Sequence, residues 1–438
     1  MSRLSALLVA YAFPPVGGAG VQRMTKLAKY LPRHGVTTRV LTAANPSAPL
    51  RDESLLGDIP PEVTVLRAKT FEPGYEMKQA AWSALAEKKK PRLKQQVMRR
   101  ATALAKQLLI PDAQLLWQPG AARVLAQRVA ARADDVVLVS APPFSQFVSA
   151  PLVRLRSGVG LVLDYRDEWS TYRTAYEMGA SRFAGLIGEQ LETLLLRSAH
   201  FVTTATAEFR ENLVSRFPFL DPARVIAIPN GYDRDDLPEV LPSPASSGAF
   251  TITYAGTVFK LTSARGFLQA VRRVHTLEPE LAKNLKVRFI GRIVDTELDA
   301  FEGTESLGIE RLGYVPHDQV LPALAESHLS LCILDDVPGV ERIYPAKIFE
   351  QMMLGRATLT LAPDGALAKL VDHHALGRRL LPRDVEGIAE VLIASLRDFA
   401  AGTFVTSMNA KGIERYDRYA LAGEFAEVLR EANRLASR

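Results

Sequence analysis

The fold is decided by two segments of similar character that lie far apart in the chain. The first reads Tyr11-Ala-Phe-Pro-Pro-Val-Gly-Gly-Ala-Gly-Val-Gln-Arg23, and the second reads Arg342-Ile-Tyr-Pro-Ala-Lys-Ile-Phe-Glu-Gln-Met-Met-Leu-Gly355. Each joins a Pro- and Gly-marked loop to a helical pattern. Backbone N–H groups at such a helix start can meet a charged ligand. Together the two segments indicate one site built from two similar halves of the chain.

Length and composition limit the possible architectures and partners. A chain of 438 residues is too long for one ordinary domain, so two or three domains are expected. The 47% apolar content supports full-sized cores, and a mean hydropathy of +0.02 fits a soluble protein. A formal charge of +6 and an isoelectric point near 9.3 suit nucleotides, phosphates or acidic lipid surfaces, without choosing among them.

Cysteine use and hydropathy point to the cytoplasm. The single cysteine, Cys332, excludes an internal disulfide, and its apolar surroundings predict a buried strand residue rather than a catalytic thiol. The apolar run 4–13 behind Arg3 is interpreted as a first strand, with a signal peptide as the alternative. No apolar run reaches the roughly 18 to 20 residues that cross a bilayer. We therefore expect a cytoplasmic protein. A peripheral location on the inner face of the membrane is the alternative.

Short apolar runs alternate with helical patterns, which predicts an α/β protein with parallel, doubly wound sheets. A Pro- and Ser-rich stretch interrupts this alternation, so we predict two Rossmann-like domains: residues 1–235, a linker at 236–248, and residues 249–415, followed by a terminal helix at 416–438. The predicted strands are 5–10, 37–41, 136–139, 160–163, 201–204, 225–228, 250–254, 285–290, 329–334 and 357–361.

The stretch 87–111 differs from its surroundings because it carries many Lys and Arg residues and no acid after Glu87. Its apolar residues recur at roughly helical spacing. A basic amphipathic helix of this kind can lie on an anionic membrane surface. The alternative is a solvated helix that covers the first domain.

In the first half, three groups of residues are candidates for ligand contacts. The loop containing Gly17, Gly18 and Gly20 follows a strand and opens a helix, where a phosphate or the sugar of a donor fits; a tight turn without a ligand is the alternative. It does not match the dinucleotide fingerprint. At later strand ends, contacts to sugar hydroxyls or a phosphate are predicted for Ser145, Asp164, Arg166 and Asp167, with a structural ion pair as the alternative for the charged ones.

In the second half, cations recur at successive strand ends, which favours an anion site over isolated surface charges. Gly256 and Thr257 end one strand, Lys260 and Arg265 follow, and Arg292 ends the next strand. Cations stabilise the negative charge that develops on a diphosphate as it departs.

The remaining ligand contacts are predicted further along the second half. Tyr314 and Val315 lie in a segment suited to holding a nucleobase, and Arg342, Tyr344, Pro345 and Lys347 lead into a helix that carries Glu350. A carboxylate one turn inside that helix can accept both hydroxyls of a ribose.

These segments resemble the retaining, family-four type of nucleotide-sugar glycosyltransferase, which has the GT-B fold. The resemblance covers nearly the whole chain, looks closest to enzymes of bacterial surface-polysaccharide synthesis, and is strongest at residues 13–31, 164–169, 228–233, 254–257 and 345–355. It implies a nucleotide-diphosphate sugar as co-substrate, no metal or other cofactor, and retained anomeric configuration. The donor then lies mainly on the second domain, the acceptor on the first, and the terminal helix crosses back to the first domain.

The same resemblance implies roles for individual residues. Glu350 corresponds to the ribose ligand, Arg265 to a diphosphate-binding lysine, and the loop at Gly18 to the one that touches the diphosphate and the transferred sugar. Three positions depart from the family pattern: Arg342 replaces an acid, Thr257 replaces a phosphate-binding arginine, and Val139-Ser-Ala-Pro-Pro143 lacks a histidine. Front-face attack, in which the departing phosphate takes the acceptor proton, needs no side-chain base.

We therefore predict a retaining hexosyltransferase in polysaccharide or glycoconjugate biosynthesis that acts on a hydroxyl acceptor. A lipid-linked molecule is one candidate for that acceptor. Arg265, Lys260, Lys347 and Glu350 are its proposed catalytic group. One alternative is an inactive nucleotide-sugar-binding scaffold, motivated by the Arg342 and Thr257 departures. A sugar-nucleotide epimerase is a weaker alternative, because no cluster of acids and histidine is evident. No nucleic-acid partner is expected.

Overall fold

The computed structural model describes residues 3–78, 109–155, 158–169, 182–246 and 248–438. It divides into two compact units. The first unit comprises Met1–Ala205, Phe209–Ile228 and Leu421–Arg438, and the second comprises Thr206–Glu208 and Pro229–Ala420. The basic stretch predicted at 87–111 lies outside the described residues up to position 108.

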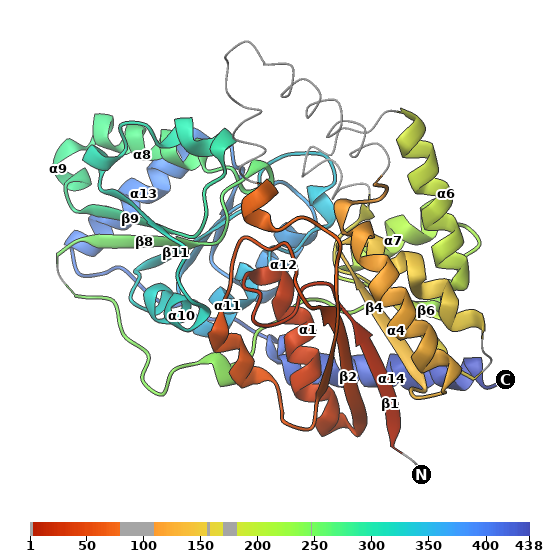
Figure 1. The fold of residues 1–438 in the computed structure, drawn as a ribbon. Coiled ribbons are helices and arrows are strands. Elements are labelled where there is room, and N and C mark those ends of the chain that lie inside the picture. The colour runs from red at the N-terminus through yellow and green to blue at the C-terminus, as the bar shows by residue number, and fades with distance from the viewer. Residues whose placement is uncertain (1–2, 79–108, 156–157, 170–181, 247) are drawn as a thin grey trace. The chain divides into compact units, whose positions relative to one another are not determined.

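The first unit is built on a seven-stranded parallel sheet with the order β3-β2-β1-β4-β5-β6-β7 (Figure 1). Register is regular, with Leu7 of β1 opposite Arg39 of β2 and Val137 of β4. The strands are β1 Leu4–Val9, β2 Val36–Ala43, β3 Thr64–Ala68, β4 Val136–Ala141, β5 Gly160–Tyr165, β6 Phe201–Thr204 and β7 Val225–Ala227.

Helices cover both faces of this sheet because its inner strands are apolar on both sides. Leu7 and Val9 join one buried cluster with α4, α6 and α7, whereas Ala6 and Leu8 join another with α1 and α14. The helices are α1 Ala19–Tyr30, η1 Leu31–His34, η2 Glu53–Asp58, η3 Ala113–Trp117, α4 Gln118–Ala130, η4 Phe144–Leu155, α6 Arg182–Ser198, α7 Ala207–Arg216, η5 Pro222–Arg224 and α14 Arg418–Ala436.

The terminal helix α14 brings the end of the chain into the core of the first unit. Its residues Leu421, Phe425 and Leu429 are buried in the same cluster as α1. Gly160 at the start of β5 lies so close to α14 that a Cβ there would come within 2.8 Å of the Ala432 backbone. The predicted return of the terminal helix to the first domain is therefore confirmed.

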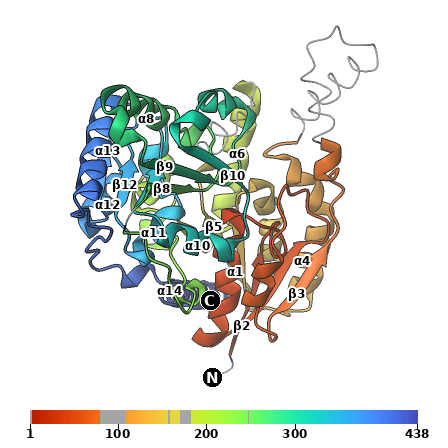
Figure 2. The same ribbon diagram turned by 90° about the vertical axis from the view of Figure 1, so that its left-hand side faces the viewer.

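The second unit has a six-stranded parallel sheet with the order β10-β9-β8-β11-β12-β13 (Figure 2). Its strands are β8 Phe250–Ala255, β9 Leu285–Ile290, β10 Ile309–Gly313, β11 Leu329–Ile333, β12 Thr358–Leu361 and β13 Arg378–Leu380. Its helices are η6 Arg234–Asp236, η7 Lys260–Thr262, α8 Arg265–Leu277, α9 Pro279–Ala282, η8 Asp295–Phe301, η9 Glu305–Leu307, α10 His317–Ala325, η10 Val340–Arg342, α11 Lys347–Leu354, α12 Ala366–His374, α13 Val385–Ala400 and η11 Glu414–Tyr416.

This sheet is also buried on both faces. Leu331 packs with α8 and α13, while Cys332, the next residue along β11, packs with α11 and α12. Burial raises the pKa of the Cys332 thiol to about 11, so the predicted buried strand cysteine is confirmed. The predicted α/β class with two Rossmann-like units is confirmed as well. Across the described part of the chain, no helix is both long and apolar enough to cross a membrane.

In each unit the strand order reverses once, and ligands of open α/β sheets bind outside the strand ends at such a point. In the first sheet the reversal falls between β1 and β4, and in the second it falls between β8 and β11. The loops after β1 and β4 carry the glycines and Ser145, and the loop after β8 carries Gly256. The predicted site residues that follow β1, β4, β8 and β11 thus lie where the topology favours a ligand, whereas those at the ends of β5, β9 and β10 lie at other strand ends.

Candidate functional site

The glycine loop of the first unit is fixed by contacts from neighbouring loops. Gly18 precedes α1 with a φ of +101°, a conformation that residues with a Cβ rarely adopt. The N–H of Gly17 donates to the Leu50 carbonyl over 3.1 Å. Arg166, which follows β5, donates to the carbonyls of Gly20 and Pro142. Arg166 therefore ties together the loops after β1, β4 and β5.

Asp164 is the electrostatic centre of this half. Its carboxylate is fully buried and forms a bidentate ion pair with Arg23 of α1, at 2.8 and 3.1 Å. The hydroxyls of Ser140 and Thr203 each donate to it over 2.7 Å. Burial opposes ionisation, but the charge and hydrogen bonds of Arg23, with those two hydroxyls, hold the pKa of the Asp164 carboxyl below its usual range. Both carboxylate oxygens are thus engaged within the protein.

Two other predicted acceptor residues, Asp167 and Ser145, belong to the same unit. Asp167 is half-buried, and burial raises the pKa of its carboxyl against the opposing charges of Arg166 and Arg23. Ser145 is buried, and its backbone N–H donates to Asp112 over 3.1 Å. Burial likewise raises the pKa of the Asp112 carboxyl. Two carboxyl groups of raised pKa therefore belong to loops at the carboxyl ends of this sheet.

In the second unit, glycines let three strand ends approach closely. The N–H of Gly256 donates to Ile290 over 2.8 Å, and the N–H of Gly291 donates to Gly313 over 2.6 Å. Gly256 has a φ of +139°, and a Cβ there would lie 3.0 Å from the Lys347 ammonium. Any other residue at this position would be strained and would crowd that ammonium.

Lys347 begins α11, and its ammonium is buried in the second unit. The Nζ atom lies 3.6 Å from the centroid of the Tyr254 ring, which gives a cation–π contact. It is shielded from solvent and has no hydrogen-bond partner among the described residues. A buried ammonium without an acceptor is costly, and an anionic ligand would supply the acceptor.

The other predicted cations differ in how they are engaged. Arg265 is 42% exposed and pairs with Asp299 at 2.5 Å and Glu297 at 3.5 Å, and it also donates to Thr296. Lys260 and Arg292 are exposed and show no ion pair with described residues. Thr257 is exposed, and its carbonyl accepts from Tyr254 and Thr262 at 2.8 and 2.7 Å. Among these predicted cations, Lys347 is therefore the one whose charged group is shielded from solvent and also lacks a hydrogen-bond acceptor among the described residues.

Glu350 lies in the first turn of α11, one turn beyond Lys347. Its carboxylate is 3.5 Å from Nε2 of His317, and the same nitrogen is 4.0 Å from the Asp236 carboxylate. Burial raises the pKa of the Glu350 carboxyl, His317, Arg418 and Lys347 lower it, and Asp236 raises it further. Burial and Asp236 thus favour the protonated form of Glu350, whereas the three cationic groups favour its ionised form.

The residues before α11 form a compact turn. Arg342 pairs with Glu341, whose second oxygen accepts from the Gly339 N–H over 2.9 Å. Tyr344 is half-buried against Phe349, Pro345 is buried, and burial raises the pKa of the Tyr344 hydroxyl. Tyr314 and Val315 follow β10, with Tyr314 38% exposed and Val315 packed beside α10. Glu341, which directly precedes the position where Arg342 replaces the family's acid, is therefore engaged within its own turn.

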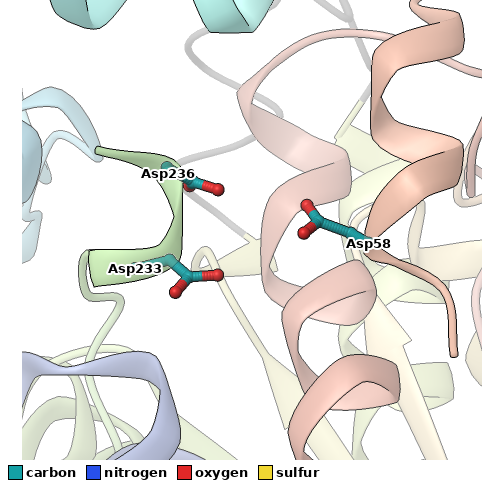
Figure 3. Close-up of side chains that lie close together, drawn as sticks. All are labelled: Asp58, Asp233 and Asp236. Carbon is teal, nitrogen blue, oxygen red and sulfur yellow. The ribbon is translucent and has the colours of Figure 1, made fainter. Parts of the chain in front are cut away.

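Figure 3 shows three aspartates that the sequence reasoning did not single out. Asp233 and Asp236 come from the second unit, where Asp233 caps η6 by accepting from the Asp235 N–H over 3.0 Å. Asp58 belongs to the first unit and pairs with Lys26 at 2.7 Å and Lys29 at 3.0 Å. Because the three carboxylates are divided between units, they define no metal site within either one.

Sequence reasoning also missed the partners that the fold supplies to the predicted residues. Arg23 pairs with Asp164, and Tyr254 underlies Lys347. His317 and Asp236 surround Glu350. The sequence offered a signal for Arg23 and Tyr254, because each lies in a segment singled out for other residues.

Comparison with known proteins gives a family for part of the chain. Residues 17–231 match the family described as "Glycosyl transferase 4-like domain". No curated protein sequence matches the chain. The family match covers strands β2 to β7, the glycines at 17–20 and the Asp164 ion pair of the first unit, and β1 precedes it.

Several solved structures are similar over nearly their whole length. Sucrose-phosphate synthase from Thermosynechococcus elongatus is 14% identical with a TM-score of 0.62, covering 98% of this chain and 99% of that one. Alr3699/HepE of Anabaena in complex with UDP-glucose is 15% identical with a TM-score of 0.62, covering 98% and 100%. The lipopolysaccharide outer core galactosyltransferase WaaB is 11% identical with a TM-score of 0.55, covering 98% and 99%.

At these identities the structural likeness shows the fold, and the family match adds the activity. The two parallel sheets and the returning terminal helix agree with the architecture predicted from the sequence. The chain is a glycosyltransferase of the GT-B fold, and its residues 17–231 belong to the glycosyl transferase 4-like domain family.

Proposed function

We propose that this glycosyltransferase moves a sugar from a nucleotide-diphosphate sugar to a hydroxyl acceptor, with retention at the anomeric carbon. The observation that carries the proposal is the ammonium of Lys347, shielded from solvent at the start of α11 with no hydrogen-bond partner among described residues. A diphosphate supplies the acceptor oxygens that this ammonium lacks. The N-terminus of α11 adds the positive partial charge of its aligned peptide dipoles.

The rest of the donor fits around that charge. In the proposal, Glu350, one turn further along α11, accepts the ribose hydroxyls. Tyr314 and Val315 hold the nucleobase, and Gly256 leaves room for the diphosphate beside Lys347. Lys260 and Arg292 remain available as further cations, whereas Arg265 must loosen its pair with Asp299 to contribute. Because a similar structure has UDP-glucose bound, uracil is the first base to test.

The acceptor half of the proposal uses the loops of the first unit. Asp167 and Ser145 orient the acceptor hydroxyl, and Gly17, Gly18 and Gly20 admit the donor sugar. Asp164 and Arg166 support these loops, because their polar atoms are engaged by Arg23 and by the carbonyls of Gly20 and Pro142. This assigns Asp164 and Arg166 to positioning rather than to direct capture of the acceptor.

The proposed reaction needs neither a side-chain base nor a metal. The bond between the anomeric carbon and the diphosphate oxygen breaks, and the acceptor oxygen bonds to that carbon on the same face. The departing phosphate oxygen takes the acceptor proton, so atoms and charge balance. Lys347 stabilises the diphosphate as its negative charge grows. The proposed setting is polysaccharide or glycoconjugate biosynthesis, a setting shared with the similar galactosyltransferase WaaB by its description.

An anionic membrane surface is a further proposed partner. The support is the sequence of residues 87–111, which is basic and carries apolar residues at helical spacing. Sedimentation with liposomes tests it: strong binding to anionic vesicles and weak binding to neutral ones is expected. Equal, weak sedimentation with both would overturn it.

The donor site is tested by titrating UDP, GDP, ADP, CDP and their glucose conjugates into the full chain by calorimetry. One nucleotide should bind tightly and lose affinity in Lys347→Met and in Glu350→Gln. Slow release of sugar without acceptor separates an active transferase from a binding scaffold, which would bind the donor and leave it intact. Binding that is equal in wild type and both variants would refute the assigned site.

A further inference from the structure

The carboxylate proposed to bind ribose does not stand alone. His317 is the first residue of α10, and Glu350 lies in the first turn of α11. Nε2 of His317 is 3.5 Å from the Glu350 carboxylate. The two side chains are only 17% and 27% exposed, so solvent screens the contact weakly.

A second carboxylate faces the same nitrogen from another element. Asp236 of η6 is 4.0 Å from Nε2 and 21% exposed. One imidazole therefore lies between two acids, and the charged groups around Glu350 are His317, Asp236, Arg418 and Lys347. Because Asp236 raises the pKa of Glu350 while the three cations lower it, His317 separates two groups that would otherwise repel each other.

We propose that His317 is a positioning residue that keeps the Glu350 carboxylate ionised and oriented toward the ribose hydroxyls of the donor. This inference rests on the proposed donor site. An ionised carboxylate accepts hydrogen bonds from both hydroxyls, whereas a protonated one has lost part of that capacity. The imidazole lies beside the Glu350 carboxylate and limits its movement, and Asp236 attracts the same nitrogen of the imidazole.

The sign of the pH effect follows from these charges. Burial raises the pKa of the Glu350 carboxyl, and a cationic His317 opposes the shift. Without that cation the pKa of Glu350 rises further, so on acidification the carboxyl is protonated earlier. The acid limb of nucleotide binding should therefore move to higher pH when His317 is replaced, an effect that a merely structural histidine would not produce.

The test compares ribose with deoxyribose. The ribo and 2′-deoxy forms of UDP, GDP, ADP and CDP are titrated into wild type, His317→Leu and His317→Gln, with His373→Gln, an exposed histidine of α12, as control. Wild type and His373→Gln should prefer the ribo form of one nucleotide by about tenfold or more. His317→Leu should lose most of that preference while binding the deoxy form as before.

His317→Gln retains an N–H near the same place but cannot be charged. It should restore much of the ribose preference near neutral pH and keep the shifted acid limb, which is measurable even where His317→Leu fails to fold. The inference about His317 would be overturned, and the donor site left standing, if His317→Leu kept the ribose preference of the wild type and His317→Gln kept its acid limb at the same pH. A wild type without ribose preference, or unaffected by Glu350→Gln, would instead refute the proposed donor site.

Discussion

The ammonium of Lys347 lies 3.6 Å from the centroid of the Tyr254 ring and has no hydrogen-bond acceptor among the described residues. The ring holds the charge by its quadrupole without consuming its N–H donors. The Tyr254 ring therefore stabilises the Lys347 ammonium, while its N–H groups remain able to donate to an anionic ligand. This relationship accounts for a lysine at the start of α11 and a tyrosine at the end of β8.

The first prediction concerns Tyr254. Tyr254→Leu removes the π face beneath Lys347 and should weaken nucleotide-diphosphate binding by roughly three- to tenfold, since a partly buried cation–π contact contributes about 1 kcal/mol. Tyr254→Phe keeps the ring and loses only the hydroxyl bond to Thr257, so it should bind nearly as wild type does. Calorimetry on both variants measures the difference, and equal affinities would contradict the role of the ring.

A second prediction concerns Gly256. Gly256→Ala places a Cβ 3.0 Å from the Lys347 ammonium on a backbone with a φ of +139°. The variant should lose about 1 kcal/mol or more of unfolding free energy and bind nucleotide less tightly. Gly57→Ala is the matched control, because a Cβ there meets nothing within 4 Å. Chemical denaturation and titration of both variants check this, and similar behaviour of the two would be evidence against it.

The third prediction concerns the buried pair of Arg23 and Asp164. Asp164→Ala leaves the Arg23 guanidinium buried and should cost about 3 to 5 kcal/mol of unfolding free energy. Because the folded-state pKa of Asp164 is lowered, its stabilisation is present above its unfolded pKa and lost as pH falls below about 4. The exposed Arg265 and Asp299 pair is the control, and Asp299→Ala should change stability little. A small effect of Asp164→Ala would remove it as an organising residue.

The fourth prediction concerns Glu192 of α6, which pairs with Arg216 at 3.2 Å. Burial raises the pKa of its carboxyl to about 7 against the opposing charge of Arg216. A raised folded-state pKa means that its contribution to stability is fully present below the unfolded pKa and declines as pH rises through 7. Glu192→Gln should therefore gain stability relative to wild type between pH 5 and 8. A stability difference that stays constant over about pH 5 to 8 would contradict the shift.

Most of the predicted strands have apolar runs that are buried on both faces, although the partly buried edge strand β7 was predicted as well. Each of the ten predicted strands has an observed counterpart, for example 285–290, which is β9. The strands that were missed are β3, β10 and β13, which are all edge strands. They carry charged residues such as Arg67, Glu310 and Arg379, as edge strands commonly do, and therefore lack a clear apolar run.

The candidate site was predictable as a set of loops and not as a set of contacts. Glycines and polar residues after predicted strands mark the correct loops, because parallel strands present their carboxyl ends at one edge. Which charge pairs with which is decided by tertiary packing. Sequence alone could not show that Arg265 is engaged by Asp299, that Arg23 neutralises Asp164, or that Lys347 has no such partner.

The most direct test of the account is nucleotide-diphosphate binding to wild type and to Lys347→Met, measured by calorimetry on the full chain. A charged hydrogen bond contributes about 1.5 to 3 kcal/mol, so the affinity of the preferred nucleotide should fall by roughly ten- to a hundredfold, with the thermal unfolding temperature preserved. Binding of the matching nucleoside, which lacks the diphosphate, should be equal in both proteins. A nucleotide affinity unchanged by Lys347→Met would contradict the central claim that this ammonium holds the diphosphate.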